Sequence, residues 1–305
     1  MLFRRRPKIS AAATEALARV LSAPTFELLP LKAAIHHTTF LPPGARVSVT
    51  ASPAKGIEAT LALCEHLQAD GFRAVPHLSA RMVRDRAHLT DIVARLKAAG
   101  VDSAFVVGGD AKSHGEYPDG LSLLRGMSEI GDRIGEIGIP CYPQGHEFIP
   151  DHPLLEALRE KAAYATYMTT QLCFDPVAIV SWLAARRSEG LSLPAHIGVP
   201  GVMEPHRLLA ISARIGVADT QRFLSKNVRL VARLVRSAGF FRPDALLEGL
   251  APHVADPDMG ISDLHVYTFN AVEVTEGWRR RYLASLGRLR PSAAEARPTA
   301  DGAAR

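Results

Sequence analysis

The chain has 305 residues, 47% of them hydrophobic, and a formal net charge of +5. This composition suits a globular protein with a sizeable core and excludes extended disorder. The positive charge comes largely from clusters near the two ends, Arg4 to Arg6 and Arg279 to Arg281, so a nucleic-acid-binding face is not expected.

The amino-terminal segment MLFRRRPK has the positive charge of a signal peptide, but charged residues interrupt the stretch that follows it. We therefore predict an amphipathic helix over 11–22. No apolar run reaches the roughly 18 residues that span a bilayer, so no membrane association is expected. The cysteines are odd in number and form no CxxC pair, which indicates a reduced, cytoplasmic compartment; they are Cys64, Cys141 and Cys173.

Short apolar runs rich in Val, Ile, Phe and Tyr alternate with segments of helical periodicity, a pattern typical of βα units in a parallel sheet. The predicted strands are 25–29, 46–51, 73–77, 103–108, 140–143, 167–174, 195–199 and 263–268. The clearest helices between them are predicted at 55–69, 84–99, 121–130, 154–164, 176–188, 205–215 and 272–286.

Eight strands favour an α/β fold closed into a single-domain (βα)8 TIM barrel, since open doubly wound sheets usually have about five or six strands. Pro42, Pro43 and Gly44 interrupt the short segment 30–45, which predicts a shortened first crossover helix. We expect an N-terminal helix in 1–23, a barrel over 24–287, a helical insertion at 217–260 and a disordered tail over 288–305. Within the insertion, helices are predicted at 219–238 and 243–250.

Polar side chains stand at or near the ends of most of the predicted strands. In a barrel these ends meet at the mouth where ligands bind. The residues are Glu27 in FELLP, Thr50 in VSVTA, His77 in VPHLSAR, Asp110 in VVGGD, Tyr142 and His146 in YPQGH, Gln171 in TTQLCFD, and Tyr267, Thr268 and Asn270 in LHVYTFN. Burying an unpaired carboxylate costs on the order of several kcal/mol, so Glu27 in an apolar strand favours function.

Several of these residues can also have a structural role. Asp110 and Asn270 can cap helices or turns, and His77 and His146 can be satisfied by local hydrogen bonds. Gln171 is hard to explain by packing, which favours a ligand contact. The spacing of His, Cys, Asp and Glu matches no metal site, so no metal is expected.

Taken in order, these motifs and IGVPGV resemble the methylenetetrahydrofolate reductase family, over most of residues 24–287. The resemblance implies a (βα)8 barrel that reduces 5,10-methylenetetrahydrofolate to 5-methyltetrahydrofolate, commonly with FAD carrying hydride from a nicotinamide donor. Glu27 is similar to the family's catalytic acid. Asp110 and Gln171 are similar to its pterin-binding residues, and Thr268 is expected in the substrate site. Positions that in the family lie along or near the flavin are matched by Thr50, His77, Tyr142, His146 and Lys161.

Several positions depart from the family pattern. Gly108 replaces an arginine that helps to hold the flavin, and Gln144 replaces the usual glutamate of YPEGH. The segment that begins at Lys161 also differs from the usual KVDAGA. These departures favour a flavin-free member in which NADH delivers hydride directly to the folate. An FAD-containing reductase and a non-catalytic folate-binding protein are the alternatives, and a homo-oligomer is compatible with the sequence.

Overall fold

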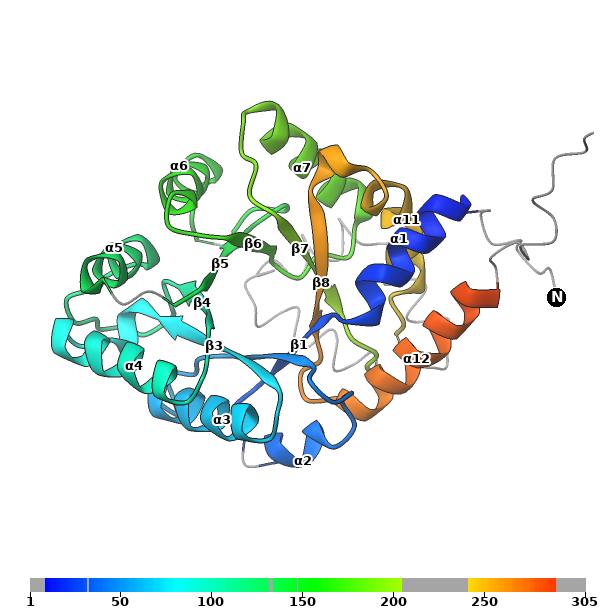
Figure 1. Ribbon diagram of the computed structural model, residues 1–305. Helices are drawn as coiled ribbons and strands as arrows, with labels where there is room; N and C mark the ends of the chain where they lie inside the picture. Colours follow the sequence, from blue (N-terminus) through cyan, green and yellow to red (C-terminus); the bar gives the residue numbers. More distant parts are fainter. Residues whose placement is uncertain (1–8, 32, 132–133, 147, 205–240, 289–305) are drawn as a thin grey trace, which may run out of the picture.

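Eight parallel strands form a closed barrel in the chain order β1 to β8. The computed structural model describes residues 9–31, 33–131, 134–146, 148–204 and 241–288. Figure 1 shows the ring of strands with helices around it. The predicted (βα)8 TIM barrel is confirmed.

The strands begin close to the predicted positions in most cases. They are β1 Thr25–Leu28, β2 Arg46–Val49, β3 Arg73–Ser79, β4 Ser103–Val107, β5 Glu136–Cys141, β6 Tyr167–Thr170, β7 Ala195–Pro200 and β8 Ile261–Tyr267. Hydrogen bonding between β1 and β8 closes the barrel and aligns Glu27 with Tyr267.

The described helices surround this barrel. They are α1 Ala11–Ser22, α2 Ala34–Thr38, α3 Ile57–Ala69, α4 Arg86–Ala98, α5 Gly120–Ile130, α6 Asp151–Ala162, α7 Pro176–Ser188, α11 Asp244–Val254 and α12 Val272–Arg288, with short 3-10 helices at Ala80–Met82 and Pro257–Met259. The first crossover helix, α2, has only five residues, as the proline-interrupted segment predicts. The predicted helices 205–215 and 219–238 lie outside the described residues, as does the predicted tail from 289 onward.

The amino-terminal helix α1 has the predicted bounds and contributes to the core. Ser10 caps it by accepting a hydrogen bond from the backbone N–H of Ala13. Leu17 and Leu21 are buried, and α1 contacts α11, α12 and β8. Figure 1 shows α1 beside α11 and α12 on the outside of the barrel. This helix thus covers the seam where the first and last strands meet.

The fifth strand differs from the prediction of 140–143, because it spans Glu136–Cys141. Glu136 and Gly138 break the apolar run on which the prediction rested. In the barrel, the Glu136 carboxylate pairs with Arg46 and accepts from Ser103. A Cβ atom on Gly138 would lie 2.3 Å from the ring of Tyr167. Glu136 and Gly138 therefore fit this strand because of their contacts with residues on β2, β4 and β6. The sixth strand likewise stops at Thr170, short of the predicted 174.

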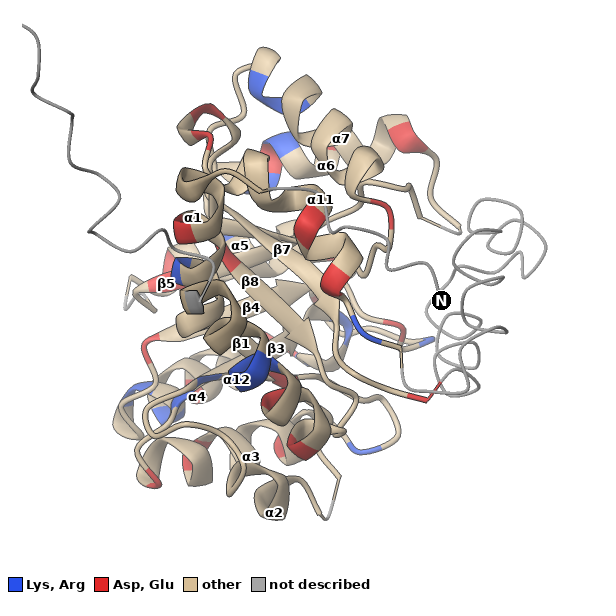
Figure 2. Ribbon diagram, turned by 90° about the vertical axis from the view of Figure 1, so that its right-hand side faces the viewer, with Lys and Arg blue, Asp and Glu red and all other residues tan. Residues whose placement is uncertain are grey.

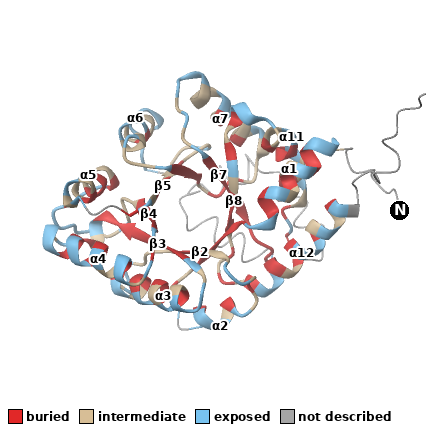
Figure 3. Ribbon diagram, viewed as in Figure 1, coloured by how far each residue is buried: buried red, intermediate tan, exposed pale blue. Residues whose placement is uncertain are grey.

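Alternate strand residues face the helices and make the main core. Figure 3 shows buried residues along the strands and on the inner faces of the helices. Leu28, Val49 and Ile197 are examples with almost no exposed surface. In Figure 2 most charged residues lie on the helices and loops, while the strands are mainly uncharged. The charged strand residues therefore stand out, and several of them point into the barrel.

Candidate active site

The barrel interior is filled by polar and aromatic side chains in place of the aliphatic ones that dominate many barrels. Toward the amino ends of the strands, the Arg46 guanidinium lies 5.3 Å from the centre of the Tyr167 ring. The Tyr167 ring stacks on His196 with centroids 4.1 Å apart. Burial raises the pKa of Asp263 in this layer to about 6. This layer closes the barrel below the candidate site.

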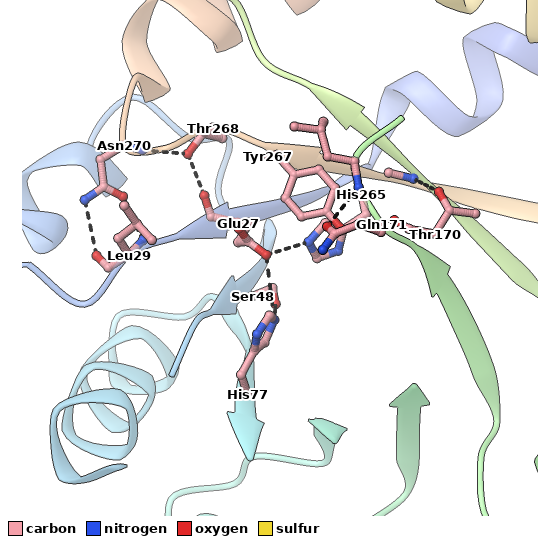
Figure 4. Close-up of polar contacts among 12 residues, drawn as sticks. Glu27, Leu29, Ser48, His77, Thr170, Gln171, His265, Tyr267, Thr268 and Asn270 are labelled. Carbon is pink, nitrogen blue, oxygen red and sulfur yellow. Dashed lines mark hydrogen bonds and ion pairs between the residues drawn. The ribbon is translucent and has the colours of Figure 1, made fainter. Parts of the chain in front are cut away.

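Glu27 lies above that layer, near the carboxyl end of β1, and is 6% exposed. Its Oε2 atom is 3.2 Å from Nε2 of His265 and 3.8 Å from Nε2 of His77. Figure 4 shows these side chains converging from β1, β3 and β8. A carboxyl group in this position has partners on one of its oxygens and can act in proton transfer at the mouth.

His77 is held as a neutral imidazole. Its Nε2 atom lies 2.7 Å from Oγ of Ser48, and its ring packs 4.8 Å from the ring of Phe105. Burial lowers the pKa of His77 to about 4, although the nearby Glu27 acts in the opposite direction. His77 is one of the residues expected along or near a flavin, and its ring faces Glu27 and Ser48 inside the barrel.

Thr268 and Asn270 connect the end of β8 to β1. The Thr268 hydroxyl donates to the carbonyl oxygen of Glu27 and accepts from the backbone N–H of Asn270. The Asn270 amide accepts from the backbone N–H of Leu29 at 2.8 Å and donates to its carbonyl at 3.2 Å. Thr268 is 0% exposed. Thr268, which is expected in the substrate site, thus donates its hydroxyl proton within the chain and also has a structural role at this junction.

Asp110 and Gln171 lie at the same end of the barrel as Glu27. Asp110 is exposed in the loop after β4. Gln171 directly follows β6 and is half-buried, and its Oε1 atom accepts from the backbone N–H of Leu172 at 2.9 Å. Figure 4 shows Gln171 in the view of the Glu27 cluster. Its amide nitrogen is the part left to donate to a ligand.

The remaining predicted residues follow β2 and β5 or lie on α6. Thr50 is half-buried directly after β2. The rings of Tyr142 and His146 lie edge to face at 5.2 Å after β5. Burial raises the pKa of Tyr142 to about 12 and lowers that of Lys161 on α6. Tyr142 also lines a cavity of about 300 Å³ between β5, α6 and α7, whose wall includes Trp182.

Sequence reasoning missed two residues of the Glu27 cluster, Ser48 and His265. Both lie two positions before a residue that was selected, Thr50 and Tyr267 respectively. Strand side chains alternate between faces, so residues two apart share the interior face. The alternation of strand side chains could therefore have identified Ser48 and His265.

Comparison with known protein families matches residues 31–277 to the family described as methylenetetrahydrofolate reductase. The chain belongs to this family. Membership supports an oxidoreductase that acts on methylenetetrahydrofolate, and it agrees with the order of the strand-end motifs. The match begins after Glu27, so the position of that acid depends on the geometry described above.

Solved structures with similar folds are distant. A proposed phosphonomutase from Burkholderia cenocepacia J2315 is 13% identical, with a TM-score of 0.42 over 92% of this chain and 99% of that one. Concanavalin B is 11% identical, with a TM-score of 0.48 over 87% of this chain and 99% of that one. At this level of similarity neither contributes to the assignment of function.

The family that this chain matches usually uses a flavin. Gly108, directly after β4, supplies no cation. A Cβ atom on Gly120 would lie 3.5 Å from the backbone nitrogen of Gly108 and 3.9 Å from Cδ of Lys161. The start of α5 therefore lies close against the end of β4, and the Lys161 stem lies close to the start of α5.

The residue ranges that the structure describes contain no group of three or more His, Cys, Asp or Glu side chains placed to hold a metal ion. Within the same ranges, none of the helices combines the length and hydropathy needed to cross a bilayer.

Proposed function

We propose that this protein reduces 5,10-methylenetetrahydrofolate to 5-methyltetrahydrofolate with hydride taken directly from NADH. The observation that carries the proposal is the buried carboxyl of Glu27, which lies 3.2 Å from His265 at the carboxyl end of the barrel. Family membership supplies the folate substrate class. Gly108, which supplies no cation directly after β4, supports direct transfer from the nicotinamide.

Glu27 acts as the general acid in this reaction. Its proton passes to the bridging nitrogen of the folate, the bond between that nitrogen and the one-carbon unit breaks, and an iminium cation remains on the folate. C4 of NADH then transfers a hydride to the iminium carbon, so NADH is oxidised to NAD⁺ and the carbon is reduced to a methyl group. The Glu27 carboxylate regains a proton from water. General acids of this kind typically contribute about 10²- to 10⁴-fold to the rate.

Asp110 and Gln171 orient the pterin in this scheme. A carboxylate that faces the 2-amino and N3–H edge of a pterin accepts paired, charge-assisted hydrogen bonds. Asp110 is exposed after β4 and free to turn toward such a ligand, and the Gln171 amide nitrogen adds a donor. Holding the two reactants in one geometry is a large part of hydride-transfer catalysis.

We assign the binding of NADH to Thr50, Tyr142, His146 and Lys161. The Lys161 ammonium suits a phosphate group, and the Tyr142 and His146 rings suit a planar base. A cytoplasmic location is part of the proposal. It is supported by the free, buried state of all three cysteines. The proposed reaction requires neither the 217–260 insertion nor self-association.

The test is an anaerobic assay of the purified protein with NADH and methylenetetrahydrofolate, after its visible spectrum has been recorded. We expect NADH oxidation without the absorbance near 450 nm that is typical of flavin. A yellow protein that loses activity when its flavin is removed would show the FAD-containing alternative. Folate binding with no turnover by NADH, NADPH or reduced flavin would show a non-catalytic folate-binding protein.

A further inference from the structure

Glu27 and His265 form a buried pair at the junction between the first and last strands. Thr25 of β1 is aligned with His265 of β8, and Glu27 is aligned with Tyr267. His265 is 3% exposed, and its Nε2 atom is 3.2 Å from Oε2 of Glu27. The hydrogen bond joins residues 238 positions apart in the chain. Water has little access to this contact, so the geometry of the carboxyl depends on its protein partners.

Both imidazoles near Glu27 approach the same carboxyl oxygen. His77 Nε2 lies 3.8 Å from Oε2 and is itself held by Ser48. The ring of Phe105 lies 4.8 Å from His77 and 6.4 Å from His265, so it packs beside both rings. Oε2 is therefore the oxygen that the protein holds, and Oε1 is the oxygen left for a substrate.

This arrangement determines where an acid proton resides. A hydrogen bond donated by Nε2–H of His265 uses Oε2 as an acceptor. The transferable proton of Glu27 is then carried by Oε1. If the hydrogen bond were lost, the carboxyl group could rotate and exchange its two oxygens, since terminal carboxyl torsions are broad and only weakly restricted.

We propose that His265 is a positioning residue that fixes the Glu27 carboxyl with its proton-bearing oxygen toward the folate. The inference rests on the proposed function of Glu27 as general acid. It assigns His265 no contact with substrate. Small losses of orientation in an active site can cost about 100-fold in rate, so removal of the contact is expected to lower kcat by roughly 10- to 100-fold.

The closest matched control in the described barrel is His196 on β7. It is also a buried histidine of the interior, 9% exposed, but it stacks on Tyr167 in the lower layer. Other titratable or charged side chains also lie near this region. They are Arg46 on β2, His77 on β3, Cys141 on β5, Tyr142 after β5, and Asp263 and Tyr267 on β8. None of these is changed in the experiment.

The experiment compares His265→Phe, His265→Gln and His265→Asn with His196→Phe. The Gln amide can place a donor near the position of Nε2, whereas the shorter Asn amide cannot. We expect the Phe and Asn variants to lose roughly 10- to 100-fold in kcat, with little change in KM for methylenetetrahydrofolate. We expect the Gln variant to recover most of the activity and His196→Phe to keep it. The Gln and Asn pair keeps the test valid if His265→Phe does not fold.

Infrared spectroscopy separates this inference from the proposed function. The C=O stretch of protonated Glu27 is identified as the band missing from Glu27→Gln. It should move to higher wavenumber in His265→Asn and stay in place in His196→Phe. A wild-type protein without turnover would refute the proposed function, and the infrared band would still show whether His265 holds Glu27. Unchanged kcat and an unmoved band in His265→Asn would overturn the positioning role.

Discussion

The hydroxyl of Thr268 donates a hydrogen bond to the backbone carbonyl of Glu27, 241 residues earlier in the chain. The last strand thereby anchors the strand that carries the candidate acid. Asn270 adds two hydrogen bonds to the backbone of Leu29, although Phe269 and Asn270 have positive φ angles of 48° and 63°. Non-glycine residues with positive φ cost energy unless their surroundings hold them. The seam between β8 and β1 is thus built to keep Glu27 in place.

Replacing Thr268 with Val should destabilise the protein by about 1–3 kcal/mol, because the Glu27 carbonyl and the Asn270 N–H lose a buried partner. Thr268→Ser keeps the hydroxyl and should lose much less. Urea unfolding measures the free energy of unfolding of both variants. A Thr268→Val protein of normal stability but with a raised KM for the folate would contradict the structural role and support the substrate contact expected of Thr268.

Replacing Glu27 with Gln should lower kcat by about 10²- to 10⁴-fold, since the amide cannot donate an acidic proton to the folate nitrogen. The Gln side chain matches Glu in size and can accept from His265, so the fold should be retained. Steady-state kinetics measures the loss of kcat, and circular dichroism shows whether the fold is retained. Turnover at the wild-type rate would remove Glu27 from its role.

Replacing Asp110 with Asn should raise KM for methylenetetrahydrofolate by roughly 10-fold or more, because charge-assisted hydrogen bonds are worth about 1.5–3 kcal/mol. Thermal stability should not change, as Asp110 is exposed. Asp91→Asn, at an exposed position on α4, is the matched control. Equal KM values for the two variants would contradict the assignment of Asp110 to the pterin.

Replacing Gly198 with Ala should destabilise the barrel by about 1–3 kcal/mol through overpacking. A Cβ atom there would lie 2.2 Å from the carbonyl oxygen of Thr170 and 2.6 Å from the ring of Tyr267. Gly287→Ala in α12, where a Cβ atom meets nothing within 4 Å, should be neutral or stabilising. Differential scanning calorimetry of the two variants gives the comparison, and equal melting temperatures would show that β7 can shift to make room.

Acid should destabilise the wild type more than His196→Phe. Burial lowers the pKa of His196 to about 3, from an ordinary value of 6.5. Between these pH values the unfolded chain binds a proton that the folded chain does not, so stability is complete above pH 6.5 and is lost as the pH falls. His196→Phe lacks this pH-dependent loss of stability, which is on the order of 3 kcal/mol between pH 7 and pH 4.

Urea unfolding of both proteins at pH 7 and pH 4 measures that difference. His152→Phe serves as the control, because the His152 side chain is 82% exposed. A wild type and a His196→Phe variant with the same loss of stability would mean that His196 is protonated in the folded barrel. Asp263 acts in the opposite direction, since its raised pKa favours the folded state at low pH.

Much of the architecture could be predicted from the sequence, because alternating apolar runs and helical segments are local patterns. The helix Ala11–Ser22, the starts of most strands and the short first crossover were all predicted from residues close together in the chain. The fifth strand was placed wrongly for the opposite reason. Glu136 and Gly138 fit a strand only when Arg46 and Tyr167 are beside them.

The sequence alone determined that this chain would form an eight-stranded barrel with polar side chains at its mouth and Glu27 within an apolar strand. Only the tertiary structure decided which partners Glu27 has. His265 contacts Glu27 because β8 is hydrogen-bonded to β1. Ser48 lies on β2, which is also hydrogen-bonded to β1, and contacts His77. Local periodicity shows which face of a strand a side chain occupies, but the closure of the barrel brings residues 238 positions apart within hydrogen-bond distance.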